Sequence, residues 1–226
     1  MNTPLARRAL LRGAVLLGVV GWHGAASCST TTIPETTMPE QATPSPSASG
    51  TAARILLAYF SRAGENYYFG GLRDLEVGNT EVLAGMIAEL IDCDVHRIEA
   101  ADPYPASYDQ TVQRNVAEQD SDVRPGIANP LDSIADYDTV LLGSPIWNVR
   151  APMIMTSFTE GHDFTAKSVL PFVTYAVSGL GSVQRDYAAA CGGARIGDGL
   201  AVRGEEVTQH RADVETWLRA AGLRTR

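Results

Sequence analysis

Two polar segments near the start of the domain carry residue types that bind anions. Ser61 comes directly after the apolar run 55–60, and Gly78, Asn79 and Thr80 come directly before a stretch whose apolar residues recur at helical spacing. A helix start offers free backbone N–H groups and the positive end of the helix dipole, and small residues let the backbone close around a phosphate. The spacing therefore indicates a phosphate site. An ordinary strand-to-helix turn with a threonine cap is the alternative.

Two later segments suit a planar ring. Each follows an apolar run of strand length, at 139–143 and 169–174, and ligands of open α/β sheets bind beyond the carboxyl ends of the strands. An aromatic side chain there can stack on a ring, although Trp147 could equally belong to the core or the surface, and the glycines to a plain loop. The candidate residues after the first run are Ser144, Pro145, Ile146, Trp147 and Asn148. The candidates at the end of the second run and after it are Thr174, Tyr175, Ser178, Gly179 and Gly181.

Strand and helix patterns alternate along the chain from residue 54, and this alternation predicts an α/β fold with a doubly wound, five-stranded parallel sheet and helices on both faces. Continuous apolar runs, instead of alternating ones, are typical of central strands that are covered on both sides. We expect strands at 54–60, 94–99, 138–143, 168–174 and within 194–203, and helices at 79–91, 107–120, 151–160, 181–190 and 208–221.

These segments together resemble the flavodoxin-like family, in its branch with a long first loop. The resemblance covers roughly residues 54 to 204, in the family's order, and implies the sheet order 2-1-3-4-5, bound flavin mononucleotide (FMN) and transfer of one or two electrons through it. The matching segments are AYFSRAGEN, GNTEVLAGMIAE, PYPASYDQTVQRNVAEQ, RPGIANPLDSIADYDTVLLGSPIWNVRAPM and DFTAKSVLPFVTYAVSGLGS.

In family terms, Ser61, Arg62, Asn79 and Thr80 would hold the FMN phosphate, with backbone N–H groups near Gly78. Arg62 would add a cation there, or else be a solvated side chain. The two later loops would flank the flavin ring. The residue after Trp147 is commonly a second tryptophan or a glycine in the family, whereas this chain has asparagine there.

The segment 62–77 is a helix-length insertion that contains Asn66 and three aromatic residues. We expect it to fold over the phosphate or the ribityl chain, the alternative being a surface excursion that packs on its own aromatics. The stretch 120–136 is rich in Pro, Gly, Asn and Asp and should be irregular.

The resemblance implies an electron carrier, or a small quinone or nitro-group reductase, whose partner is a redox protein or a small electron acceptor. A cofactor-free binding or scaffold module on the same fold is the alternative function. No residue stands out as a general acid or base, and none is needed because the cofactor carries the redox chemistry.

The charge and composition of the chain exclude several classes of partner and ligand. Residues 1–50 hold three arginines and two acidic residues, which leaves 15 basic and 24 acidic residues in 51–226, a net charge of −9. This acidity argues against nucleic acid or an anionic membrane surface as the domain's partner. The four histidines are scattered, so no metal site is predicted. Cys93 and Cys191 could pair in an oxidising compartment, but nothing in the sequence requires it.

The first 53 residues are predicted to lie outside the fold. Arg7 and Arg8 precede a short apolar stretch, 13–21, as in a twin-arginine export signal; a general-secretion signal that happens to contain paired arginines is the alternative. Ala25 to Cys28 resembles a lipoprotein cleavage box. We therefore expect a signal over 1–28 with Cys28 acylated, a flexible Ser/Thr/Pro linker over 29–53 and the domain over 54–226, exported and held at the cell membrane only by the lipid.

Overall fold

The computed structural model describes residues 54–226. The predicted signal, Cys28 and the linker lie outside the described residues. Within them, a parallel sheet runs in the order β4-β1-β5-β6, followed by β7 and β8, which both pair with β6. This arrangement confirms the doubly wound sheet, with the fifth strand divided into two short pieces. The strands are β1 (Ile55–Tyr59), β4 (Asp94–Arg97), β5 (Thr139–Pro145), β6 (Ser168–Tyr175), β7 (Arg195–Ile196) and β8 (Leu200–Arg203).

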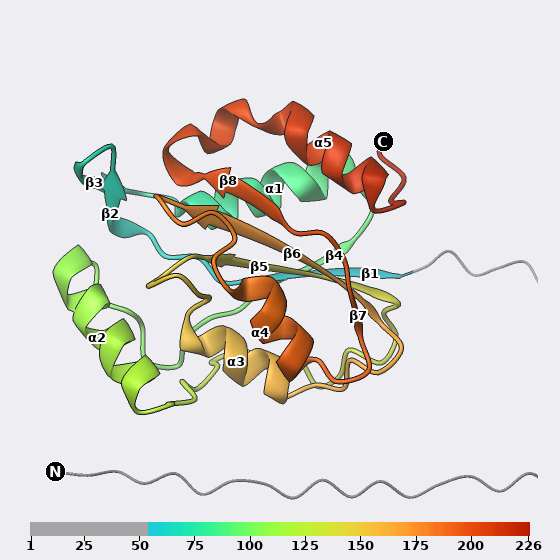
Figure 1. Cartoon of the computed structure of the whole chain (residues 1–226), viewed down its shortest axis with the longest axis horizontal. Coiled ribbons are helices and arrows are strands. Elements are labelled where there is room, and N and C mark those ends of the chain that lie inside the picture. The colour runs from blue at the N-terminus through green and yellow to red at the C-terminus, as the bar shows by residue number, and fades with distance from the viewer. Residues whose placement is uncertain (1–53) are drawn as a thin grey trace, which may run out of the picture. The chain divides into compact units, whose positions relative to one another are not determined.

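Helices cover both faces of this sheet (Figure 1). Helices α1 (Asn79–Leu90) and α5 (Arg211–Ala220) pack on one face, and α3 (Met153–Glu160) and α4 (Val183–Ala190) on the other. Side chains of a strand point alternately to the two faces. Leu57 of β1 accordingly packs in the core beneath α1 and α5, whereas its neighbour Leu56 packs in the core beneath α3 and α4. Burial on both faces explains the continuous apolar runs.

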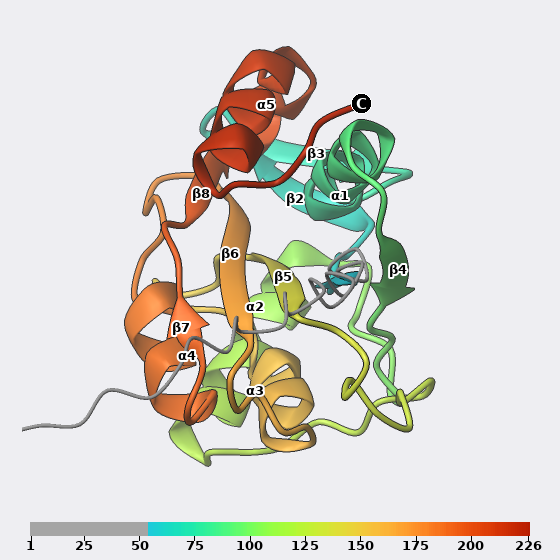
Figure 2. The ribbon, with the colours of Figure 1, turned by 90° about the vertical axis from the view of Figure 1, so that its right-hand side faces the viewer.

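Helix α2 (Tyr108–Asp120) takes a different position. It lies beyond the carboxyl ends of the strands (Figure 1, left), and therefore behind the sheet in the end-on view of Figure 2. The guanidinium of Arg114 lies over the ring of Tyr104, and the Tyr104 hydroxyl donates to Glu118 at 2.8 Å, so these two contacts hold α2 on the preceding segment. Val112 and Val116 remain 42% and 40% exposed, and both line a cavity of the molecule.

The insertion after β1 forms a β-hairpin, which the sequence did not predict. Strands β2 (Gly64–Tyr68) and β3 (Gly71–Leu75) pair antiparallel. Phe69 and Gly70 form the turn with φ values of 45° and 88°, the left-handed pair that suits the twist of a two-residue hairpin. At its base, the backbone N–H of Glu65 donates to the carbonyl of Ala106, which precedes α2.

The tip of the hairpin reaches a second element. The backbone N–H of Phe69 donates to the carboxylate of Glu205 at 3.2 Å. Glu205 belongs to η1 (Gly204–Gln209), a 3₁₀ helix between β8 and α5 that the sequence predicted only as loop and helix start. The hairpin therefore bridges the α2 side and the η1 side at the carboxyl ends of the strands.

The segment 121–138 has no helix or strand, as expected from its composition. Within residues 54–226, no helix is long and apolar enough to span a membrane.

Candidate functional site

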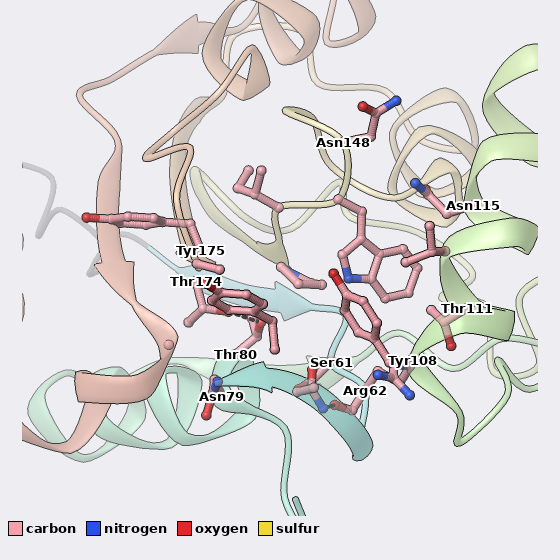
Figure 3. A pocket seen from close by; sticks show the side chains of 18 of the residues that line it. Ser61, Arg62, Asn79, Thr80, Tyr108, Thr111, Asn115, Asn148, Thr174 and Tyr175 are labelled. Atoms are coloured by element: carbon pink, nitrogen blue, oxygen red, sulfur yellow. Dashed lines mark hydrogen bonds between the residues drawn. The ribbon is translucent and has the colours of Figure 1, made fainter. Parts of the chain in front are cut away.

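A cavity of about 330 Å³ opens at the carboxyl ends of the strands, where the loops after β1, β5 and β6 meet (Figure 3). The hairpin and α2 close its remaining sides. Eleven of the sixteen residues proposed from the sequence line this cavity: Ser61, Arg62, Asn66, Asn79, Thr80, Pro145, Ile146, Trp147, Asn148, Thr174 and Tyr175.

The start of α1 forms the polar end of the cavity. Gly78 precedes the helix, and a Cβ at this position would lie 2.3 Å from Ser61 Oγ and 2.5 Å from the carbonyl oxygen of Arg62, so only glycine fits. Ser61 Oγ accepts the backbone N–H of Glu81 at 3.1 Å and thereby caps the helix. The backbone N–H groups of Asn79 and Thr80 have no hydrogen-bond partner within residues 54–226. Two donors at the positive end of the helix dipole are thus free for an anion.

Thr80 also anchors this end to the sheet. Its hydroxyl shares a hydrogen bond of 2.7 Å with the hydroxyl of Thr174 at the end of β6. Both residues are buried, so the pair is shielded from water and fixes the helix start against the strand.

Arg62 lines the cavity, but backbone carbonyls engage most of its guanidinium. Its guanidinium donates to the backbone carbonyls of Glu65, Pro105 and Ala106, and so ties the base of the hairpin to the segment before α2. Burial lowers the pKa of Arg62 from its ordinary value. Only Nε is without a partner within the described residues. Arg62 therefore lines the cavity mainly as a clamp for the hairpin.

Trp147 forms the apolar wall of the cavity. Its ring meets Phe60 and Tyr104 edge to face, with centroid distances of 5.6 Å and 5.1 Å. The next two residues, Asn148 and Val149, have φ values of 50° and 60° and close a tight turn between Trp147 and Arg150. This conformation is common for asparagine but strained for a β-branched valine.

Helix α2 holds this turn from the other side. The side-chain amide of Gln119 donates to the backbone carbonyl of Trp147 at 3.3 Å, and Asn148 Nδ2 donates to Gln119 Oε1 at 2.9 Å. The asparagine that departs from the family pattern is therefore fixed by a residue of α2.

The remaining predicted residues do not line the cavity. Ser144 is fully buried in β5, and Ser178 and Gly179 lie in the loop after β6. Gly181 supports the tryptophan turn: its φ is +53°, and a Cβ there would lie 2.1 Å from the carbonyl oxygen of Val149. That carbonyl accepts the backbone N–H of Ser182 at 2.8 Å, so the close approach locks the two loops together.

Several lining residues were not proposed from the sequence. They come from the hairpin, from α2, and from the segments that follow β6 and β8: Tyr67, Tyr108, Thr111, Val112, Asn115, Val116, Ala176, Gly204 and Glu205. Those of α2 recur at helical spacing and so share one face. That periodicity was readable in the sequence, but the position of α2 beyond the strand ends was not.

Few charged side chains line the cavity. Arg62 and Glu205 are the charged residues among those that line it. One end is polar, at the start of α1, and the other is apolar and aromatic, at Trp147. No three His, Cys, Asp or Glu side chains among residues 54–226 are grouped as a metal site would require. The geometry suits an elongated ligand with an anionic or hydroxylated tail and a flat apolar ring.

Comparison with known proteins agrees with this reading of the fold. The sequence profile of the flavodoxin family matches residues 54–221. A candidate flavoprotein from Bacteroides uniformis ATCC 8492 is 28% identical, with a TM-score of 0.59 over 75% of this chain and 99% of its own. A second one, from Bacteroides eggerthii DSM 20697, is 24% identical, with a TM-score of 0.60 over 76% and 99%.

A flavoprotein from Lactobacillus acidophilus NCFM, solved in complex with FMN, is 18% identical, with a TM-score of 0.50 over 70% of this chain and 98% of its own. At this identity the likeness concerns the fold alone. No curated protein sequence matches the chain. The profile match over 54–221, together with the sheet order and the site at the strand ends, shows that the chain belongs to the flavodoxin family.

Proposed function

We propose that the domain binds FMN in the cavity at the strand ends and transfers electrons through it. The observation that carries this proposal is the convergence of three strand-end loops on one cavity, with free backbone donors at one end and Trp147 at the other. Membership of the flavodoxin family supports it.

The residues at the polar end suit a phosphate. The free N–H groups of Asn79 and Thr80 can donate to phosphate oxygens, and the Asn79 side chain lines the same region. Such a site does not need a cation, because the aligned peptide dipoles of α1 supply the positive potential. This is consistent with the engagement of Arg62 by backbone carbonyls.

The residues at the apolar end suit a flavin ring. Pro145, Ile146 and Trp147 line the cavity after β5. Tyr175, the last residue of β6, lines it as well (Figure 3). Bound FMN would supply the chemistry of electron uptake and release. The chain's own contribution is to bind and orient the ring and to exclude water from it with the hairpin and α2.

We propose further that the protein works outside the cytoplasm, as a carrier or as a small quinone or nitro-group reductase. The twin-arginine pattern supports export of an already folded cofactor protein, and the box ending at Cys28 supports a lipid anchor. Cell fractionation and mass spectrometry of the N-terminal peptide test this part. A wild-type protein that stays in the cytoplasm, or an unmodified Cys28 in the membrane fraction, would contradict it.

The test of the cofactor is the absorbance spectrum of the purified full-length protein, followed by release and identification of any bound flavin. We expect the visible bands of oxidised flavin, and their bleaching by anaerobic dithionite. A colourless protein that takes up no added FMN would favour the cofactor-free binding module instead. Oxidation of NADPH in the presence of a quinone would separate a reductase from a carrier, which needs a separate electron donor.

A further inference from the structure

One carboxylate lies at the polar end of the cavity, where the proposed function places a phosphate. Glu205 lines the cavity, and its neighbour Gly204 abuts the side chain of Asn79 so closely that a Cβ on Gly204 would lie 2.5 Å from Asn79 Nδ2. Glu205 is therefore next to the start of α1.

The two oxygens of this carboxylate differ. Oε1 accepts the backbone N–H of Phe69 at the hairpin tip, at 3.2 Å. Oε2 is buried and has no hydrogen-bond partner within residues 54–226. A buried carboxylate oxygen without a donor is costly, so it favours a ligand that brings a hydrogen-bond donor to it.

Within residues 54–226, this carboxylate has no ion-pair partner; its one hydrogen bond is to the Phe69 N–H. Arg62 is the cation that lines the cavity, and its terminal nitrogens already donate to three backbone carbonyls. One of the helix-start donors is also used, because the Glu81 N–H donates to Ser61 Oγ. The attraction for a dianion therefore comes from the N–H groups of Asn79 and Thr80 and from the longer-range charge of Arg62, and the charge of Glu205 opposes it.

We propose that Glu205 sets the specificity of the site for the tail of its flavin, accepting a hydroxyl hydrogen and opposing a phosphate dianion. The inference rests on the proposed function. Its consequence is that the site accepts riboflavin, whose tail ends in a hydroxyl group, nearly as readily as FMN.

The test is a titration of full-length apoprotein with FMN and with riboflavin, followed by quenching of flavin fluorescence. We expect the wild type to prefer FMN by less than about thirtyfold, and Glu205→Gln to raise that preference by roughly tenfold, mainly through tighter FMN binding. The glutamine oxygen can still accept the Phe69 N–H, so the hairpin anchor is kept.

Two further variants separate charge from structure. Glu206→Gln removes the same charge one residue away, from a side chain that does not line the cavity, and should leave the preference within about twofold of wild type. Glu205→Ala removes both the charge and the anchor to Phe69. It should raise the preference at least as much as Glu205→Gln.

Each contrary outcome overturns the inference in a recognisable way. A wild type that binds both flavins but prefers FMN by more than about thirtyfold, or a Glu205→Gln protein with the wild-type preference, removes the role of the carboxylate. If the preference for FMN changes in Glu205→Ala but not in Glu205→Gln, the effect comes from the lost contact with the Phe69 N–H and not from the charge. A wild type that binds neither flavin refutes the proposed function itself, and the inference with it.

Discussion

The hydroxyl oxygens of Thr80 and Thr174 lie 2.7 Å apart, and both residues are almost completely buried. The pair joins the first residues of α1 to the last residues of β6, and both side chains line the cavity. Thr80→Val or Thr174→Val leaves the partner hydroxyl buried without a hydrogen bond, so we expect each to lower the free energy of unfolding by about 1–3 kcal/mol. Urea denaturation of apoprotein measures this.

The double variant Thr80→Val/Thr174→Val serves as the control for that loss. Because it leaves no hydroxyl unsatisfied, it should be less destabilised than the sum of the two single variants. Strict additivity would show that the two hydroxyls do not depend on each other.

Trp147→Ala should weaken flavin binding by at least about tenfold, because the ring wall and the edge-to-face contacts with Phe60 and Tyr104 are lost together. Trp217→Phe is the matched control. Trp217 lies on α5, packs near Phe172 and donates to the carbonyl of Asp198, so its loss should reduce stability while leaving flavin affinity unchanged. Flavin fluorescence titrations of both variants provide the measurement. Equal affinity losses would argue for a general effect of instability.

The sheet was predictable because strands that are buried on both faces appear in the sequence as continuous apolar runs, such as the one from Ile55 to Phe60. The hairpin was not predictable in the same way. Its first strand, with Glu65, Asn66, Tyr67 and Tyr68, is partly buried throughout and shows no alternation. Its turn is Phe69-Gly70, which lacks the Asn-Gly or Asp-Gly signal of a two-residue hairpin.

The residues of the site that directly follow strands were predictable from the sequence. The residues that reach the site through long-range packing were not. Residue types placed Asn79, Trp147 and Tyr175 at the carboxyl edge, which is where they line the cavity. The sequence predicted α2 as a polar helix, but its position follows from long-range contacts such as Gln119 with the Trp147 carbonyl. The same limit applies to Arg62, because its carbonyl partners at Pro105 and Ala106 lie more than forty residues away.

Cys93 and Cys191 are both free thiols. Burial raises the pKa of Cys93 to about 11 and that of Cys191 to about 12, so at pH 8 both are almost entirely protonated and react slowly. Iodoacetamide labelling with peptide mapping should modify each residue far faster in denaturant than in the folded protein. A disulfide-linked peptide containing both cysteines would contradict the structure.

Two histidines make the fold sensitive to mild acid. His96 and His162 both contact Phe158, and burial lowers the pKa of each, with a further lowering of the His96 pKa by the charge of His162 and an opposing effect of Glu99. The unfolded chain therefore binds more protons. The folded protein keeps its full free energy of unfolding above the unfolded histidine pKa of about 6.5. That free energy falls as the pH drops below this value and through the lowered pKa values of the folded state.

Urea midpoints between pH 7.5 and 5 measure this effect, and the double variant His96→Gln/His162→Gln should lose less stability over that range than the wild type. The chosen window lies above the titration of the exposed carboxylates, whose pKa values are lowered by hydrogen bonds, such as Asp122 and Glu160. A double variant with an unchanged pH slope would show that the two imidazoles do not cause it.

Gly181 and Gly179 form a natural pair for testing whether the loop after β6 supports the tryptophan turn. Both have positive φ values, +53° and +56°, so alanine should cost about 1 kcal/mol of backbone strain at either position. At Gly179 nothing lies within 4 Å of the added Cβ, whereas at Gly181 it would meet the Val149 carbonyl oxygen at 2.1 Å. Gly181→Ala must therefore displace the turn that holds Trp147. We expect it to be more destabilised than Gly179→Ala by at least about 2 kcal/mol in urea denaturation, and to bind flavin more weakly. Equal effects in the two variants would mean that the contact between Gly181 and Val149 does not position the turn.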